Sequence, residues 1–314
     1  MNRYPYNGTW IACGAYAFIQ ASGLDKNLLI EVENCAGATF GMKSLGREWD
    51  YTRILTPFKD FHCGIDDAAY LWGINIKLDI LESPDSFKED MLDADADGFV
   101  FGPVNMEGLR YLVLPQQYHL SDHFFAVKRD DKQKYVLYDS EGIPGMSIDA
   151  RQIADWLCIA NIPESNNKIY IRTLYKYGDP VDIKERLDYE ISVATRNFKS
   201  AAETGQGANA FLLCRNVIEE DNLLYAKWRE SLFYNLNYVV QRRLMMVQLI
   251  ERASHIGTYS CRMNFWKLIK KQIQTSGCCL DALGREDING IVLNLKLLYE
   301  SEVELLQRWE DWLI

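Results

Sequence analysis

The distribution of proline divides this chain of 314 residues in two. All eight prolines lie at or before Pro180, and no proline follows it. Apolar segments before Asp179 are short and separated by Gly and Pro, whereas after it apolar residues recur over long stretches. Proline breaks helices, so only the second half can hold long uninterrupted ones. With a typical domain length of roughly 150 residues, we predict two domains, residues 1–178 and 179–314.

The second half has the pattern of a helical bundle. Apolar residues recur there at steps of three and four, which is typical of helix faces that pack into a core. We predict an all-α domain with two such faces: Leu224, Trp228, Leu232, Leu236, Val240, Leu244 and Val247; and Ile288, Ile291, Leu295, Leu298, Leu305, Trp309 and Trp312.

The first half mixes helical and strand patterns. A helix comes first and a set of strands follows, which indicates an α+β domain with an antiparallel sheet. The polar segment 129–133 separates two strand patterns and predicts a hairpin. The expected helices are 12–22, 66–73, 86–93 and 148–157, and the expected strands are 74–80, 98–102, 123–128, 134–139 and 168–174.

Charge and hydropathy exclude several classes of protein. Lys and Arg number 34 against 44 Asp and Glu, a net charge of −10, which disfavours duplex DNA or a polybasic membrane surface as a partner. No apolar run approaches the roughly 18 residues that span a bilayer, and the first residues lack the apolar core of a signal peptide. We therefore expect a cytoplasmic protein with no nucleic-acid or membrane partner.

One cysteine stands apart from the other seven. Without an export signal most of the eight should be reduced thiols that act as small buried hydrophobes. Cys13, however, lies at the start of the first predicted helix, where free amides and the helix dipole stabilise a thiolate. Cys13 is therefore the candidate nucleophile, although a small residue on a buried helix face would look the same.

The predicted hairpin supplies a base for this cysteine. With the turn centred near Asp131, His123 lies opposite Asp139 to within one residue, and cross-strand Cβ atoms are roughly 4.5–5.5 Å apart. A carboxylate there can hold one imidazole nitrogen and leave the other facing a thiol. The chain order Cys13, His123, Asp139 thus predicts a catalytic triad.

Two weaker candidates remain open beside this triad. Asn7 could donate to an oxyanion together with the backbone N–H of Cys13, or it could simply form a turn before Gly8. His119, Asp122 and His123 could bind zinc, but Pro115 and the following strand pattern argue against the helix that this spacing needs. No motif for a nucleotide or another cofactor occurs, so we expect neither a metal nor a cofactor.

Longer blocks of sequence carry a family resemblance. The blocks are Cys13 with Gly23, Gly102–Met106 with Leu109 and Tyr111, Ser121–Val127, and Tyr135–Gly142. In these features residues 5–175 resemble the butirosin biosynthesis protein H N-terminal domain family, a papain-like branch found in peptide and antibiotic gene clusters. The segment Lys128–Asp130 departs from the small, Gly-containing turn expected after the histidine strand.

The resemblance implies a papain-like fold and an acyltransferase. The namesake of the family moves an aminoacyl group from an acyl-carrier-protein thioester to an aminoglycoside amine. By analogy, Cys13 would take the acyl group, His123 would activate Cys13 and later deprotonate the acceptor, Asp139 would orient His123, and Asn7 would donate to the oxyanion. Phosphopantetheine would enter only as part of the carrier-bound substrate.

The resemblance also implies partners, namely an acyl or peptidyl carrier protein and a small amine acceptor in nonribosomal peptide or antibiotic biosynthesis. Two alternatives stay open: a peptidase or thioesterase with the same triad, and an inactive papain-like scaffold. A second copy of the chain is a further possible partner, in a homodimer through the aromatic-rich C-terminal helices. Basic segments that could dock an acidic carrier, unless they are ordinary solvated helix faces, are Lys227-Trp228-Arg229, Arg242-Arg243, and Lys267, Lys270 and Lys271.

Overall fold

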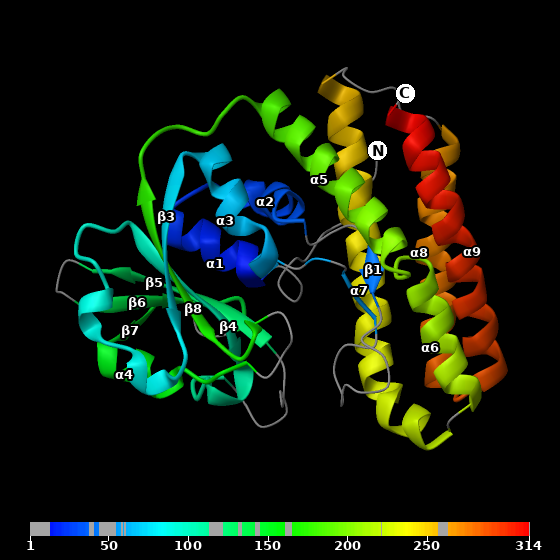
Figure 1. The fold of residues 1–314 in the computed structure, drawn as a ribbon, viewed down its shortest axis with the longest axis horizontal. Coiled ribbons are helices and arrows are strands. Elements are labelled where there is room, and N and C mark those ends of the chain that lie inside the picture. The colour runs from blue at the N-terminus through cyan, green and yellow to red at the C-terminus, as the bar shows by residue number, and fades with distance from the viewer. Residues whose placement is uncertain are drawn as a thin grey trace. The chain divides into compact units, whose positions relative to one another are not determined.

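The chain forms two compact units in the computed structural model (Figure 1). The sheet unit consists of Asn7–Ala36 and Asp60–Asp182, and the helical unit of Met1–Tyr6, Gly37–Lys59 and Ile183–Ile314. The main division, after Asp182, falls close to the predicted boundary at residue 178. The structure describes residues 13–37, 41–43, 55–57, 59, 61–112, 122–130, 134–141, 145–160, 165–220, 222–256 and 263–313.

The segment Gly37–Lys59 groups with the helical unit, although it lies within the first half of the sequence. Its short strands β1 (Met42–Lys43) and β2 (Thr56–Pro57) pair with each other. Leu55 N donates to Asn235 Oδ1 at 3.0 Å, and Met42 is buried in the core of the helices. These long-range contacts explain why a sequence boundary drawn at one point does not separate the two units.

The sheet unit is built on a six-stranded antiparallel sheet within the described residues. In the order of hydrogen-bonded neighbours, its strands are β3 (Ile74–Leu81), β8 (Ile169–Lys176), β4 (Gly98–Asn105), β5 (Asp122–Arg129), β6 (Tyr135–Tyr138) and β7 (Met146–Ile148). The five strands predicted from the sequence are confirmed. β7 was not predicted, because three residues are too few to show a period of two.

Helices and turns cover this sheet. The helices are α1 (Cys13–Ser22), α2 (Leu29–Cys35), α3 (Ile65–Ala68) and α4 (Ala150–Trp156). The chain after α3 continues as a 3-10 turn to Trp72 and ends at Gly73, whose φ of 64° is the left-handed C-cap that glycine favours. α4 begins after Asp149, which forms a capping box with Gln152.

The helix expected at 86–93 is wrong. Two short 3-10 helices, Pro84–Ser86 and Glu89–Met91, take its place, because Phe87 and Lys88 between them are extended. Phe87 and Met91 nevertheless pack against the core of the unit. Two separate turns, rather than one amphipathic helix, therefore place these apolar side chains on the same core.

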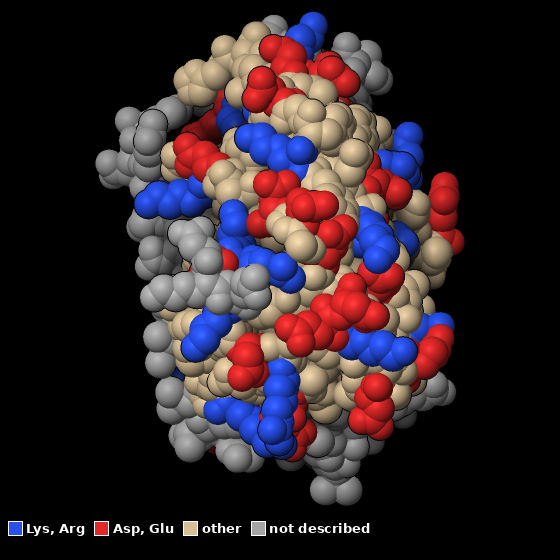
Figure 2. Space-filling model, turned by 90° about the vertical axis from the view of Figure 1, so that its left-hand side faces the viewer, with Lys and Arg blue, Asp and Glu red and all other residues tan. Residues whose placement is uncertain are grey.

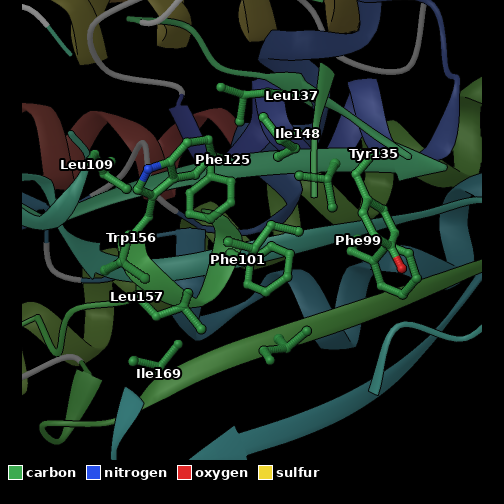
Figure 3. Close-up of a cluster of buried hydrophobic side chains, with 14 of the residues drawn as sticks. Phe99, Phe101, Leu109, Phe125, Tyr135, Leu137, Ile148, Trp156, Leu157 and Ile169 are labelled. Atoms are coloured by element: carbon green, nitrogen blue, oxygen red, sulfur yellow. The ribbon is translucent and has the colours of Figure 1, made fainter. Parts of the chain in front are cut away.

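The aromatic core of the sheet unit is drawn in Figure 3. Phe101 and Phe125 from adjacent strands stack with their ring centroids 4.9 Å apart, and Trp156 of α4 meets Phe125 edge to face. α1 packs against β4 and β5. Gly98 permits part of this approach, because a Cβ at that position would lie 2.5 Å from the carbonyl oxygen of Ala21.

The helical unit contains five long helices in its described part. They are α5 (Ile183–Glu203), α6 (Asn209–Glu220), α7 (Asn222–Ile256), α8 (Met263–Gly284) and α9 (Ile288–Leu313). The helical prediction for the second half is confirmed, and most of the predicted core positions that are described are buried. Ile288 is an exception, since it is exposed at the first residue of α9. Among the described residues, no helix is long and apolar enough to cross a membrane.

The cysteines are less uniformly buried than the sequence suggested. Seven lie in the described residues and all are free thiols. Burial is complete for three of them and raises the pKa of Cys214 and Cys279, as expected for inert thiols. The thiols of Cys63 and Cys278 are exposed, and those of Cys13 and Cys158 are half-buried.

Candidate active site

The structure places Cys13 at the first residue of α1. The neighbouring Gly14 has no room for a side chain, because a Cβ there would lie 2.4 Å from the Phe61 ring. Phe61 in turn packs edge to face on Phe124 of β5. The small residue after Cys13 therefore lets the start of α1 lie close to the start of β5, the strand that carries His123.

His123 and Asp139 are in contact within the buried part of the site. His123 Nε2 and Asp139 Oδ1 are 2.8 Å apart, and each residue is 2% exposed. Since Asp139 occupies Nε2, Nδ1 is the nitrogen left for the hydrogen bond between His123 and the side chain of Cys13. The structure thus brings together three of the four predicted site residues.

The register predicted between β5 and β6, which placed His123 opposite Asp139 to within one residue, is wrong by two residues. Ala126 pairs with Tyr138 and Arg129 with Tyr135, so the ladder would place His123 opposite Glu141. Asp139 lies two residues before Glu141, diagonal to His123 on the same face of the sheet. Diagonal neighbours are close enough for longer side chains to meet, which explains why the pair still forms.

A bulge in β4 sets the position of His123. The pairing with β5 shifts between Phe101 and Val104, and Val104 then pairs with His123. Gly102, within the bulge, has a φ of 141°, and a Cβ there would lie 2.7 Å from the carbonyl oxygen of His123. Only glycine suits this close approach and this backbone conformation.

A buried arginine holds the same bulge from the adjacent strand. Arg172 of β8 donates through Nη1 to the carbonyl oxygen of Gly102 at 3.0 Å. Its guanidinium also makes two hydrogen bonds, of 2.8 and 3.0 Å, to the carboxylate of Asp66. This bidentate pair fixes the arginine in the core, so the backbone beside His123 has little freedom to move.

The electrostatics of the site favour a protonated histidine. Burial alone would lower the pKa of His123, but the charge and hydrogen bond of Asp139, helped by Cys13, outweigh it and raise the pKa to about 10. Burial likewise opposes ionisation of Asp139, yet His123 and three hydrogen bonds hold its pKa below the usual value. At neutral pH the pair is therefore an imidazolium and a carboxylate beside a cysteine.

Further residues of the site were not assigned a role from the sequence. The Tyr111 hydroxyl donates to Asp139 Oδ2, and the Glu141 backbone N–H donates to Asp139 Oδ1 at 2.7 Å. Tyr16, one turn after Cys13, has its pKa raised by burial and by the nearby Asp139 and Tyr138. Tyr111 belongs to the blocks that carry the family resemblance, but nothing in its spacing points to Asp139.

Two of the residues singled out in the sequence, the oxyanion candidate Asn7 and the zinc candidate His119, lie outside the described residues. Within the described part of the chain, no group of three His, Cys, Asp or Glu side chains could hold a metal ion. Asp122 begins β5 next to His123 and is half-buried.

One of the three basic segments considered for carrier docking is excluded. Arg242 and Arg243 are each only 1% exposed, because Arg243 pairs with Glu302 at 2.5 Å and Arg242 donates to the Tyr238 hydroxyl inside the bundle. Arg229 pairs with Glu286 at 2.6 Å. On the face drawn in Figure 2, Lys and Arg are interspersed with Asp and Glu, with no large area of one sign. On α8, Lys267, Lys270 and Lys271 are all exposed.

Comparison with known proteins gives no independent assignment. No protein-family model matches the chain, and no curated protein matches it closely enough to count as a relative. The function proposed for this protein therefore rests on the geometry of the site and on the resemblance described above.

Proposed function

We propose that this protein is a cysteine-dependent acyltransferase with a papain-like sheet unit, which moves an acyl group from a carrier-protein thioester to an amine. One observation carries the proposal: His123 bonds the carboxylate of Asp139 through one nitrogen and the side chain of Cys13 through the other. An imidazolium held in this way beside a thiol is the arrangement that activates cysteine nucleophiles.

The first step forms an acyl-enzyme. The Cys13 thiolate attacks the carbonyl carbon of the thioester, and the carbon–sulfur bond to the carrier arm breaks. The departing sulfur takes a proton from the His123 imidazolium, so His123 becomes neutral and Asp139 keeps its orientation. The raised pKa of His123 means that its first role at neutral pH is that of an acid, because the proton is already on the imidazole.

The second step transfers the acyl group. The acceptor amine attacks the acyl carbon while neutral His123 accepts the amine proton, and the Cys13 thiolate leaves. The imidazolium and thiolate are then restored, and the product is an amide. One thioester replaces another in the first step, and amide formation makes the second step favourable. The two steps therefore need no cofactor beyond the phosphopantetheine of the donor.

The choice of carrier and acceptor rests on the family resemblance. Carrier proteins are commonly acidic, and the exposed Lys267, Lys270 and Lys271 of α8 are the basic segment that could receive one. Peptide or antibiotic biosynthesis in the cytoplasm is the corresponding setting. Water in place of the amine would give a peptidase or thioesterase through the same three residues.

The decisive experiment is intact-protein mass spectrometry after mixing the full chain with carrier proteins loaded with different acyl groups. We expect an acyl adduct on the wild type and on Cys158→Ala, which removes another half-buried thiol, but none on Cys13→Ala. Addition of an amine should discharge the adduct to an amide.

Other outcomes assign the protein to the alternatives. Discharge of the adduct at the same rate without amine, giving free acid, would identify a hydrolase. A Cys13→Ala protein that retains full biological function, together with no adduct from any carrier, would identify an inactive scaffold.

A further inference from the structure

A tyrosine holds the outer oxygen of the triad carboxylate. Tyr111 follows the 3-10 turn Met106–Gly108, and its hydroxyl donates to Asp139 Oδ2. The ring contacts Trp156 of α4 with centroids 4.6 Å apart and Phe125 of β5 at 6.5 Å, both edge to face. The ring thus packs between two elements of the core, and its hydroxyl points at a buried carboxylate.

The flanking leucines anchor this short segment. Leu109 and Leu112 are both buried in the core of the sheet unit, and Leu112 N donates to the Leu109 carbonyl at 2.9 Å. Tyr111 lies inside the resulting turn. Since both ends of the turn are fixed by burial, its hydroxyl has little freedom to leave Asp139.

We propose that Tyr111 is a positioning residue of the triad, which fixes the rotation of the Asp139 carboxylate so that Oδ1 faces His123. This role rests on the proposed function of Cys13, His123 and Asp139.

The hydrogen bonds of Asp139 explain why a second anchor matters. Oδ1 accepts from both His123 Nε2 and the Glu141 N–H, so one oxygen serves two donors. A donor on Oδ2 opposes a rotation of the carboxylate that would exchange its two oxygens. Tyr111 supplies that donor and adds no charge that would compete with His123.

The tyrosine also remains a donor over the whole working range of pH. Burial, together with the adjacent Asp139 charge, raises the pKa of Tyr111 well above its ordinary value. Its proton therefore stays on the phenol while His123 gains and loses its own. A lysine or histidine at this position would instead add a cation to the buried carboxylate and compete with the imidazolium.

The test is Tyr111→Phe in the full-length protein, which keeps the ring contacts and removes the hydroxyl. Loss of this donor should leave Asp139 more basic, so Asp139 should hold the His123 proton more tightly. We expect the titration midpoint of His123, followed by ¹⁵N NMR of the imidazole and assigned with His123→Gln, to rise by about half a unit or more. We also expect kcat for transfer to fall about 5-fold with KM within about twofold.

Tyr175→Phe is the matched control, because it also removes a tyrosine–aspartate hydrogen bond from the sheet unit, the 2.6 Å contact with Asp93 Oδ2. It should leave the His123 midpoint and kcat unchanged. If Tyr111→Phe lowers only the melting temperature and leaves both the midpoint and kcat at their wild-type values, the positioning role is wrong.

The two proposals fail separately in this design. Tyr111→Phe could shift the titration midpoint of His123 while the wild type forms no acyl adduct at Cys13. That result would support the positioning contact and overturn the proposed function. Adduct formation at the same rate in wild type and Tyr111→Phe, with an unmoved midpoint, would overturn the role of Tyr111 alone.

Discussion

Each unit of this protein buries an ion pair, and the two pairs differ in the nature of the cation. In the sheet unit the pair is His123–Asp139, and in the helical unit it is Arg243–Glu302. All four side chains are at most 3% exposed. An imidazole can release its proton within the ordinary range of pH, whereas a guanidinium cannot.

The two ion pairs also differ in the side chain that hydrogen-bonds to them. His123 bonds Cys13, which can become a nucleophile, whereas Glu302 accepts from the amide of Gln272 at 2.8 Å. The pair in the helical unit can therefore hold helices together but cannot move a proton. Arg172–Asp66 in the sheet unit belongs to the same static type as Arg243–Glu302. A buried charge alone therefore does not indicate a catalytic site, whereas a titratable cation beside a nucleophile does.

The largest expected effect comes from removing the titratable cation. His123→Gln should reduce the rate of Cys13 acylation about 10³–10⁴-fold, because the imidazolium that protonates the leaving group is lost. The measurement is the rate of adduct formation by mass spectrometry under single-turnover conditions. The same substitution at the exposed His255 of α7 is the control and should leave the rate unchanged. An acylation rate within a fewfold of wild type in His123→Gln would contradict the triad.

The static pair should give the opposite result. Glu302→Gln leaves the Arg243 charge buried without its carboxylate, which should cost about 3–5 kcal/mol of stability and leave the chemistry of the sheet unit unaffected. Thermal unfolding and the acylation rate are the two measurements. Replacing both partners, Arg243→Met with Glu302→Leu, should recover most of the stability, since neither partner then leaves a buried charge without its counterion. Failure of the double variant to recover would show that the pair does more than balance charge.

The sequence predicted the parts of the fold that depend on local patterns. Alternation of apolar and polar residues marked 74–80 as a strand, and the polar segment 129–133 marked the hairpin of β5 and β6. The grouping of Gly37–Lys59 with the helices could not be predicted, because it depends on contacts such as Leu55 with Asn235 that are far apart in the chain.

The candidate site was likewise predictable only where it depends on local patterns. Cys13 follows from a helix start, and His123 with Asp139 follows from a hairpin, which are local signals. Tyr111 reaches Asp139 across 28 residues, and no pattern in its neighbourhood indicates this. The burial of Arg242 and Arg243 does have a signal in the sequence, since apolar residues surround them: Val239, Val240, Leu244, Met245, Met246 and Val247.

A smaller effect separates Cys13 from the exposed thiols. At neutral pH iodoacetamide should modify Cys13 about tenfold faster than Cys63 or Cys278, although both of these are more exposed. The reason is the imidazolium beside Cys13, so the preference should disappear in His123→Gln. Peptide mapping of partially alkylated protein gives the ratios. Uniform labelling of the thiols, or no labelling at Cys13, would contradict an activated cysteine.

The smallest expected effect is the dependence of stability on pH. Since folding raises the pKa of His123 from 6.5 to about 10, its stabilising contribution is complete below pH 6.5 and is lost as the pH rises through 10. Folding lowers the pKa of Asp139 from 3.8, so its contribution is present above pH 3.8 and is lost as the pH falls further. The melting temperature of wild type should therefore exceed that of Asp139→Asn by a few degrees between pH 4 and 6.5, and the difference should shrink towards pH 10. In a His123→Gln background the same Asp139→Asn change should show no such decline, because no imidazole remains to titrate. A difference that stays constant from pH 5 to 10 would mean that the charge of His123 is not coupled to folding, and the contrast with the arginine pair would then lose its basis.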